Sequence, residues 1–511
     1  MQPSFPGCSI WEALNRLENV QKKIGNAAKW SSITEVVAKL ISPFTNAVLA
    51  RLLLPEAFGA VATINMVISF AEIFADAGFQ KYIIQHEFES EEALDESSNV
   101  AFWTNITISL LIWSVICLFR NQLAAMAGDA TLGNGMAVAS LTMMMISFSS
   151  IQMARFKRKL DFRSMFVSRM VATFIPLVVT VPLALLLRNY WALIFGTLTA
   201  QLAQAVFLTL KSKWRPQFRY SWQRLKEMIS FSIWTLVETI SIWLTSYIDT
   251  FIVGNVLNNY YLGLYKTSMS TVNSYTAIIT NSVVPVLFSA LSRLQNDEQA
   301  FRDVFFKVQR MLAMLVFPMC AGLYLYRGLV TRILLGANWT ETTDFIGLWA
   351  LMSGATIVLS SLNSEVYRSK GRPKVSLLGQ ILHLLVLIPV LIITVERGFE
   401  TLYVARSLVR LQLIVVGWFL MWWVARISPW LVARNVLPAL LATSVMWAVS
   451  LLLQQFGQGT LWELASVGIC IVVYAGMILA MPTTRRDLLS IGVVRKILKK
   501  SPGTQKLAGR T

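Results

Sequence analysis

Charged residues are scarce in this sequence. Only 14% of its 511 residues are Asp, Glu, Lys or Arg, whereas a soluble globular protein carries about 25%. Apolar residues make up 55%, and they gather in blocks that follow one another from Ala27 to Pro482. Each block holds about 20 residues, enough for a helix to cross ~30 Å of hydrocarbon. This composition excludes a soluble enzyme, a disordered chain and a secreted disulfide scaffold, and it predicts a polytopic helical membrane protein.

Cysteine and histidine are also rare. The four cysteines form no CxxC pair, three of them fall inside apolar blocks, and the two histidines are far apart in sequence. We therefore expect neither a disulfide nor a metal site. The sequence has no Walker motif, G-x-G-x-x-G, H-E-x-x-H or G-x-S-x-G. We expect no cofactor and no ATP hydrolysis, so any transport would be driven by an ion gradient or by the substrate gradient.

The apolar blocks predict fourteen transmembrane helices with short connections. They are expected at residues 29–50, 57–77, 98–119, 134–153, 165–187, 190–210, 228–253, 259–287, 309–328, 343–365, 375–395, 400–424, 435–455 and 462–481. Because the connections are short, we expect an all-α membrane protein with no large domain outside the membrane.

Basic residues outnumber acidic ones, 45 to 27, and the net charge is +18. In a soluble protein this excess would suggest a nucleic acid partner, but the cytoplasmic loops of membrane proteins collect Lys and Arg. When the N-terminus is placed in the cytoplasm, most of the Lys and Arg residues fall on that side of the predicted spans. We therefore expect both termini in the cytoplasm and no nucleic acid partner.

Two of the predicted spans lie at equivalent places of a weak internal repeat. Trp30 and Gly59 bracket the first span and its exit turn, and Trp234 and Gly263 bracket the seventh at the same spacing. Six spans separate the two starting points, and because six is even, both halves would cross the membrane in the same orientation. Parallel repeats of this kind occur in transporters, related by an axis along the membrane normal.

Three spans carry polar side chains at a spacing of three or four residues. They are Glu35, Lys39, Ser42 and Asn46 in the first, Glu238, Ser241, Thr245 and Asp249 in the seventh, and Lys266, Ser270, Asn273 and Asn281 in the eighth. This spacing places each set on one helix face, which lipid cannot solvate. We predict that these faces line a central hydrophilic cavity. The alternatives are that Glu35 and Lys39 only pair with each other, or that the polar faces only join helices.

Two arginines lie within another of the predicted spans. Arg406 and Arg410 lie one helical turn apart in the predicted span 400–424. Two permanent cations in low dielectric suit a phosphate or a carboxylate ligand. The alternative is that both side chains snorkel to the outer membrane surface.

Four short motifs resemble those of bacterial polysaccharide exporters. They are Arg51-Leu-Leu-Leu-Pro-Glu-Ala-Phe-Gly59 after the first span, Gly78-Phe-Gln-Lys-Tyr-Ile-Ile-Gln85 after the second, Asp249-Thr-Phe-Ile-Val-Gly254 with Leu262-Gly-Leu-Tyr265, and Gly371-Arg-Pro-Lys374 after the tenth. On these motifs the chain resembles the lipid-linked oligosaccharide flippase and exporter branch (Wzx-type, colanic-acid-exporter-like) of the multidrug/oligosaccharidyl-lipid/polysaccharide (MOP) exporter superfamily. The resemblance covers most of the chain.

The resemblance implies a MATE-like bundle of two pseudo-symmetric six-helix lobes with two accessory helices at the C-terminal end. In this chain the segments would be an amphipathic cytoplasmic segment at 1–28, an N-lobe at 29–212, a C-lobe at 228–424, accessory helices at 435–481 and a basic cytoplasmic tail at 482–511.

The resemblance also implies a function. Members of this branch are thought to translocate an undecaprenyl-pyrophosphate-linked oligosaccharide, an O-antigen or exopolysaccharide repeat unit, across the bacterial inner membrane by alternating access coupled to protons or sodium. Membrane lipids, a polysaccharide polymerase and a chain-length regulator are the further partners to expect.

A cationic cavity would suit the pyrophosphate of such a substrate. We expect the cavity to be lined by Lys39, Lys266, Arg406, Arg410, Asn46 and Asn273. The candidates for ion coupling are the carboxylates Glu35, Glu238 and Asp249, because burial can raise the pKa of a carboxylate toward the working pH. Asp249 has an alternative role as a gate partner of Lys266.

Two other functions remain as alternatives. A drug or metabolite antiporter of the same superfamily would favour an acidic, aromatic cavity, and the basic residues of the predicted cavity weigh against it. A membrane glycosyltransferase or polymerase would need acidic catalytic residues in a sizeable outer region, whereas the outer loops of this chain are short. We therefore expect a transporter and not an enzyme.

Overall fold

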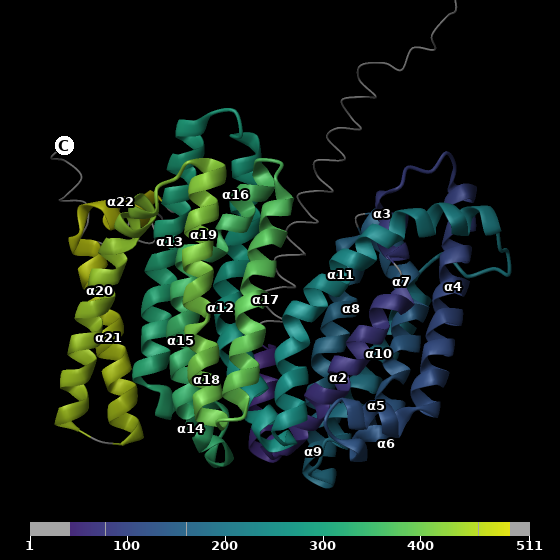
Figure 1. The fold of residues 1–511 in the computed structure, drawn as a ribbon, viewed down its shortest axis with the longest axis horizontal. Coiled ribbons are helices and arrows are strands. Elements are labelled where there is room, and N and C mark those ends of the chain that lie inside the picture. Colours follow the sequence, from purple (N-terminus) through teal and green to yellow (C-terminus); the bar gives the residue numbers. More distant parts are fainter. Residues whose placement is uncertain (1–40, 77, 160, 458, 491–511) are drawn as a thin grey trace, which may run out of the picture. The chain divides into compact units, whose positions relative to one another are not determined.

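The computed structural model describes residues 41–490 except 77, 160 and 458 (Figure 1). Among these residues the side chains at 76, 162, 230–238, 373 and 488–490 are also outside the description. Helices make up nearly all of the described chain, which contains no β-strand. The predicted all-α class is therefore confirmed.

Residues 41–52 are helical, and the helices that follow have these bounds. They are α2 Pro55–Asp76, α3 Phe79–Gln85, α4 Glu91–Leu118, α5 Arg120–Met126, η1 Ala130–Leu132, α6 Gly133–Ala139, α7 Leu141–Arg158, α8 Phe162–Ile175, η2 Pro176–Thr180, α9 Val181–Leu187, α10 Trp191–Lys211, α11 Trp222–Val256, α12 Asn259–Arg293, α13 Glu298–Leu325, α14 Arg327–Leu334, η3 Ala337–Thr342, α15 Thr343–Thr356, η4 Ile357–Ser361, α16 Asn363–Ser369, α17 Pro373–Val395, α18 Phe399–Leu408, α19 Arg410–Ala425, α20 Pro429–Phe456, α21 Thr460–Ala480 and α22 Pro482–Ser490.

Twelve helical segments in the described residues are long and apolar enough to cross a membrane. The other two predicted spans correspond to α11 and to residues 41–52, which are the described end of the first span. The multi-pass helical membrane protein is thus confirmed, while the count of fourteen spans stays approximate. Several helices also extend beyond their predicted ends: α4, for example, begins seven residues earlier than the predicted span 98–119.

Several long helices start at a residue whose side chain caps the first turn. Ser90 accepts a hydrogen bond from the amide of Ala93 at 3.1 Å at the start of α4, and Asp297 accepts one from Ala300 at 3.0 Å at the start of α13. The first amides of a helix have no partner inside the helix, so these side chains satisfy a donor that would otherwise need water. Polar capping residues therefore mark where these helices begin, in polar sequence ahead of the apolar runs.

The contacts divide the chain into two compact units, one that extends to Gly263 and one that begins at Leu264. In the first unit, hydrophobic cores form between α2, α6, α7 and α10, and between α3, α4 and α7. In the second, one core joins α13, the α15–α16 segment, α19 and α20. The predicted boundaries of the lobes and of the accessory helices stay predictions.

The glycines of the predicted repeat meet at a close helix contact in the first unit. A Cβ atom on Gly59 would overlap the carbonyl oxygen of Asn259, and one on Gly263 would overlap the carbonyl oxygen of Pro55. Only glycine allows the backbones of α2 and the start of α12 to approach this closely. A hydrogen bond of 2.5 Å from Asn259 Nδ2 to Asp129 Oδ2 lies beside this contact.

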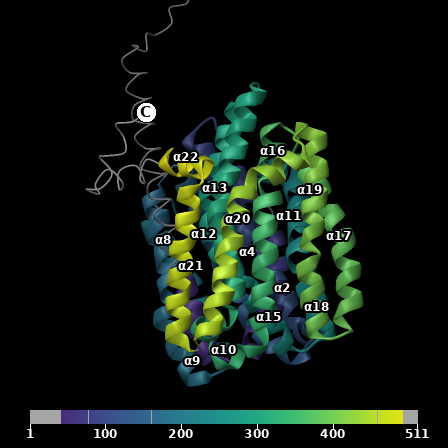
Figure 2. The ribbon, with the colours of Figure 1, turned by 90° about the vertical axis from the view of Figure 1, so that its left-hand side faces the viewer.

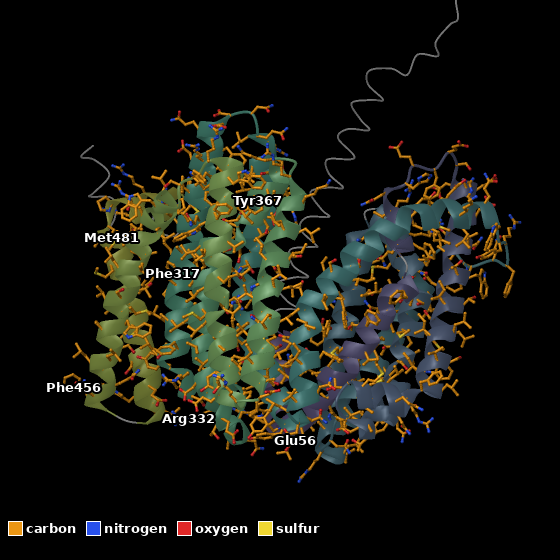
Figure 3. All side chains as sticks on the ribbon, in the orientation of Figure 1. Glu56, Phe317, Arg332, Tyr367, Phe456 and Met481 are labelled. Carbon is orange, nitrogen blue, oxygen red and sulfur yellow. The ribbon has the colours of Figure 1, made fainter. Side chains whose placement is uncertain are left out.

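In the second unit, successive long helices cross the unit from one end to the other. Figure 3 shows Phe456, at the end of α20, and Met481, just after α21, at opposite ends of the helix pair, with Arg332 toward the end that carries Phe456. The helices α20 and α21 lie side by side along their length (Figures 1 and 2).

A single π turn interrupts the helix that runs from α15 to α16. In this turn, η4, the backbone carbonyls of Val358 and Leu359 accept hydrogen bonds from Gln309 Nε2 at 3.2 Å and Trp418 Nε1 at 3.1 Å. A π turn takes its carbonyls out of the regular helical pattern, and side chains of neighbouring helices can then bind them. These bonds fix α15 against α13 and α19.

Candidate functional site

The two predicted arginines converge on one tryptophan inside the second unit. Arg406 lies near the end of α18, Arg410 is the first residue of α19, and Trp349 lies on α15. The guanidinium carbon of Arg406 is 5.1 Å from the centre of the Trp349 ring, and that of Arg410 is 4.3 Å from it. Both distances are within the range of a cation–π interaction.

Hydrogen bonds from α12 hold this group in place. Arg406 Nε donates to the hydroxyl of Tyr265 at 3.2 Å, and Trp349 Nε1 donates to Asn273 Oδ1 at 3.3 Å. Tyr265 and Trp349 are fully buried, and Arg406 is only 8% exposed. We call Tyr265, Asn273, Trp349, Arg406 and Arg410 the Trp349 cluster. The inward direction of both arginines argues against snorkelling to the outer surface.

Two further aromatic rings and a hydrogen bond to a backbone carbonyl pack against the Trp349 cluster. Phe345 lies 5.5 Å from the Tyr265 ring and stacks on Tyr403 at 5.2 Å. Thr356 Oγ1, at the end of α15, donates to the carbonyl of Arg410 at 3.5 Å. This hydrogen bond links α15, which carries Trp349, to α19, which carries Arg410. The packing of the two helices therefore fixes the positions of these side chains.

The electrostatics of the cluster favour an anion. Two permanent cations share one buried ring, and Arg410 makes no ion pair with a carboxylate within the described part of the chain. Its Nε atom is also buried with no hydrogen-bond partner among the described residues. A buried charge is costly unless it is paired. A phosphate or carboxylate placed beside the ring would supply the missing acceptor.

The other predicted site residues are spread over the chain. Lys266 lies beside Tyr265 on α12 and is half-buried, and Asn46 is exposed in the unit that ends at Gly263. Asp249 is buried on α11, where its Oδ1 accepts from the amide of Thr250 at 2.7 Å. Glu35 and Lys39 lie outside the described residues, as does the side chain of Glu238. The role of each of these residues stays a prediction.

Sequence reasoning missed Trp349 and Tyr265. Tyr265 ends one of the motifs that resemble polysaccharide exporters, so a signal existed, but the motif does not say that its hydroxyl binds an arginine. Trp349 is one of seventeen tryptophans in an apolar chain. Nothing in its local sequence distinguishes a cation platform from a core residue, because the arginines come from a segment more than fifty residues away.

A second polar site, also missed, lies within the first unit. Glu72 on α2 lines a pocket of about 230 Å³. The pocket's other polar residues are Asn65, Ser69, Thr142, Thr197, Gln201 and Tyr247. Trp243 Nε1 donates to Ser69 Oγ at 3.0 Å at its side. A carboxylate inside a membrane span is a functional candidate by default, and Glu72 lies in a segment that is apolar enough to cross the membrane.

Comparison with known proteins places this chain in a family. A family described as "Polysaccharide biosynthesis protein" matches residues 48–344. The succinoglycan biosynthesis transport protein ExoT of Rhizobium meliloti (strain 1021) is 24% identical over 333 residues, which cover 65% of this chain and 67% of that protein. The resemblance to polysaccharide exporters is thereby confirmed.

Solved structures show the same fold. The lipid II flippase MurJ, in an inward closed conformation, matches with a TM-score of 0.72 at 15% identity, covering 90% of this chain and 99% of that chain. An inward-facing multidrug resistance MATE family transporter of the MOP superfamily matches with a TM-score of 0.59 at 11% identity, covering 79% and 99%. The predicted MATE-like fold is confirmed.

Proposed function

Because the chain belongs to the polysaccharide biosynthesis protein family, we propose that it translocates a lipid-linked oligosaccharide across the bacterial inner membrane. The substrate would be a repeat unit joined to undecaprenyl pyrophosphate, and the movement would use alternating access. The transport role named for its Rhizobium relative and the fold shared with a lipid II flippase support this proposal. On this view the protein is a transporter and makes or breaks no covalent bond.

The observation that carries the proposal is the Trp349 cluster. Two guanidinium groups within 5.1 Å of one ring centre place two cationic side chains together inside a membrane helix bundle. A pyrophosphate offers two adjacent phosphates, and each can accept paired hydrogen bonds from a guanidinium. Asn273, Lys266, Asn46 and Lys39 are the further residues we propose for the head group and sugar.

We propose that ion coupling depends on carboxylates in the membrane. The candidates are Glu35, Glu238 and Asp249, and Glu72 joins them because of its polar pocket. A carboxylate that binds a proton or a cation must change its surroundings between inward-open and outward-open states. The gate pair of Asp249 with Lys266 remains the alternative role for Asp249.

We also propose the cellular setting. Both termini lie in the cytoplasm, and the translocated unit passes to a polysaccharide polymerase and a chain-length regulator. The lipid-linked substrate and the surrounding membrane lipids are the remaining partners.

The test replaces each arginine of the cluster in a strain whose own copy of the gene is deleted. Arg410→Ala and Arg406→Ala are expected to lower surface polysaccharide at least tenfold, because a hydrogen bond to a charged group contributes about 1.5–3 kcal/mol. Arg410→Lys is expected to restore part of the activity, since an ammonium keeps the charge but loses the planar fork.

Arg397→Ala is the matched control, because Arg397 is an exposed arginine of the same unit outside the cluster. Immunoblots of membranes check that every variant is present at the level of the wild type. Normal export by both alanine variants of the cluster would place the pyrophosphate site elsewhere.

A multidrug antiporter is the second candidate, favoured by the MATE-like fold. The Trp349 cluster would repel the cationic compounds that an acidic, aromatic cavity would attract. If the deletion strain becomes sensitive to cationic drugs while its surface polysaccharide stays normal, the antiporter replaces the flippase as the function.

A further inference from the structure

A basic pocket lies at one end of the unit that ends at Gly263, and it shares no residue with the two sites already described. Its volume is about 410 Å³, and it lies where α7 and α10 end and α4 begins. Three lysines line it: Lys159, Lys211 and Lys213. None of them pairs with a carboxylate in the described part of the chain.

The two carboxylates of the pocket are already engaged. Asp95 Oδ1 lies 2.5 Å from Arg155 Nη1. Asp161 caps α8, where Oδ1 accepts from the amide of Ser164 at 3.1 Å and Oδ2 accepts from its hydroxyl at 2.8 Å. Arg155 balances Asp95, and the single charge of Asp161 is less than that of the three lysines, so the pocket wall keeps an excess of positive charge.

One wall of the pocket is formed by Arg155, which is held by neighbouring side chains, and by an unsatisfied amide. Arg155 donates to Ser98 Oγ at 3.1 Å and lies over the ring of Trp214 at 5.5 Å. Gln152, one turn earlier on α7, is 1% exposed, and neither its Nε2 nor its Oε1 has a partner among the described residues. Buried polar groups are nearly always hydrogen-bonded. Gln152 lines the pocket, so a ligand there would supply its partner.

An apolar groove of about 440 Å³ lies between the same three helices. Its lining includes Phe148 on α7 and Val206 and Leu210 on α10, and it exposes no polar surface. Phe148 is one helical turn from Gln152, and Leu210 adjoins Lys211 in sequence. The cationic pocket and the hydrocarbon groove are thus built on the same three helices, with lining residues one turn apart on α7 and consecutive on α10.

We propose that the pocket and the groove together bind one anionic phospholipid. Lys159, Lys211 and Lys213 would hold its phosphate, Gln152 Nε2 would donate to a phosphate or ester oxygen, and an acyl chain would lie along Phe148. Free phosphate would satisfy the lysines but would leave the groove without an occupant. The amphipathic lining therefore favours a lipid over a soluble anion, and the site shares no residue with the Trp349 cluster.

The experiment measures which lipids stay bound to the purified protein. Wild-type protein is reconstituted in nanodiscs of equal parts phosphatidylglycerol and phosphatidylcholine, extracted in mild detergent, and analysed by native mass spectrometry. We expect retention of phosphatidylglycerol over phosphatidylcholine. Each lysine replaced by alanine is expected to weaken this preference roughly fivefold, since one basic residue contributes about that factor at an anionic surface.

Three variants test the lysine charge, the Gln152 amide and the apolar groove separately. The double variant with Lys211→Ala and Lys213→Ala removes charge, Gln152→Leu removes the amide at nearly constant volume, and Val206→Trp fills the groove. Lys157→Ala is the matched control, because Lys157 also lies at the end of α7 but donates to Gln80 Oε1 at 3.0 Å outside the pocket. Size-exclusion profiles confirm that each variant is folded.

The proposal is supported if the three variants lose phosphatidylglycerol and Lys157→Ala keeps it. It is overturned if wild type shows no preference between the two lipids, or if the three variants retain phosphatidylglycerol as the control does. It is also overturned if inorganic phosphate displaces the lipid in the wild type while Val206→Trp has no effect, because the pocket would then bind phosphate without a chain. None of these readouts depends on transport.

Discussion

Trp349 is expected to control how tightly the protein binds a pyrophosphate head group, although the tryptophan itself carries no charge. Its ring lies 5.1 Å and 4.3 Å from the guanidinium carbons of Arg406 and Arg410, and its Nε1 binds Asn273. Trp349→Leu keeps an apolar side chain at this buried position but removes the π surface and the N–H donor. Both arginines would then gain rotamers that the ring now excludes.

The expected loss of head-group affinity follows from the rotamer freedom that the two arginines gain. Ordering a rotamer-rich side chain on binding costs about 0.5–1.5 kcal/mol, so two arginines cost about 1–3 kcal/mol. A free energy of 1.4 kcal/mol corresponds to a tenfold change in affinity. We therefore expect Trp349→Leu to weaken head-group binding by roughly 5- to 150-fold. Trp349→Phe keeps a ring and loses the hydrogen bond to Asn273. We expect its affinity for the head group to lie between that of Trp349→Leu and that of the wild type.

The assay is calorimetric titration of purified protein in nanodiscs with farnesyl pyrophosphate, a short isoprenoid that carries the same head group. Farnesol, which lacks the pyrophosphate, gives the contribution of the isoprenoid chain alone to the binding free energy. Trp447→Leu is the matched control, because Trp447 belongs to the same unit and stacks on Tyr324 at 5.1 Å, outside the Trp349 cluster. Thermal unfolding of each variant separates lost binding from lost fold.

One result would refute the reasoning. If Trp349→Leu is folded and binds farnesyl pyrophosphate within twofold of Trp447→Leu, the ring does not organise the arginines for binding. Equal loss for farnesol and farnesyl pyrophosphate would also contradict it, because the effect would then concern the chain and not the anion.

Three further predictions concern other parts of the molecule. Gly263→Ala is expected to lower the free energy of unfolding by about 1–3 kcal/mol, because its Cβ would overlap a backbone carbonyl of α2; Gly328→Ala, with nothing within 4 Å, should be neutral in the same thermal unfolding assay. Glu72→Gln is expected to reduce transport driven by a proton or sodium gradient in proteoliposomes while head-group binding persists, and equal transport with wild type would remove Glu72 from the coupling site. Reporter fusions after Arg188 and after Lys213 are expected on opposite membrane faces, with Arg188 periplasmic, and the same face for both would contradict the topology.

Much of the architecture was predictable because it depends on local chemistry. Apolar runs of about 20 residues can satisfy their backbone in lipid only as helices, so the all-α membrane class follows from composition and spacing alone. The motif from Arg51 to Gly59 indicated the family, and Gly59 and Gly263 of the repeat proved to be the two glycines at one close backbone contact. The helices and the motif depend on residues near each other in sequence, whereas the contact of Gly59 with Gly263 is tertiary and the repeat spacing did not predict it.

For the arginine pair, the sequence predicted the proximity of the two cations but not the direction of their side chains. One helical turn separates Arg406 from Arg410, and this spacing predicted two neighbouring cations for an anionic ligand. The sequence left open whether they point inward or snorkel outward, because both arrangements suit the same helix. The packing of α15 against α18 and α19 decided it, since Trp349 and the hydroxyl of Tyr265 hold the guanidinium groups inside the unit.

By itself, then, the sequence determined the helices and the family, and it indicated the arginine pair but not Glu72. Only the tertiary structure decided which distant side chains meet: Trp349 with the arginines, Glu72 with its polar pocket, and Gln152 with three lysines. The physical reason is that helix formation depends on backbone hydrogen bonds between residues four positions apart, whereas a binding site needs groups from several helices. Their meeting depends on how whole helix faces pack, and no local spacing encodes that packing.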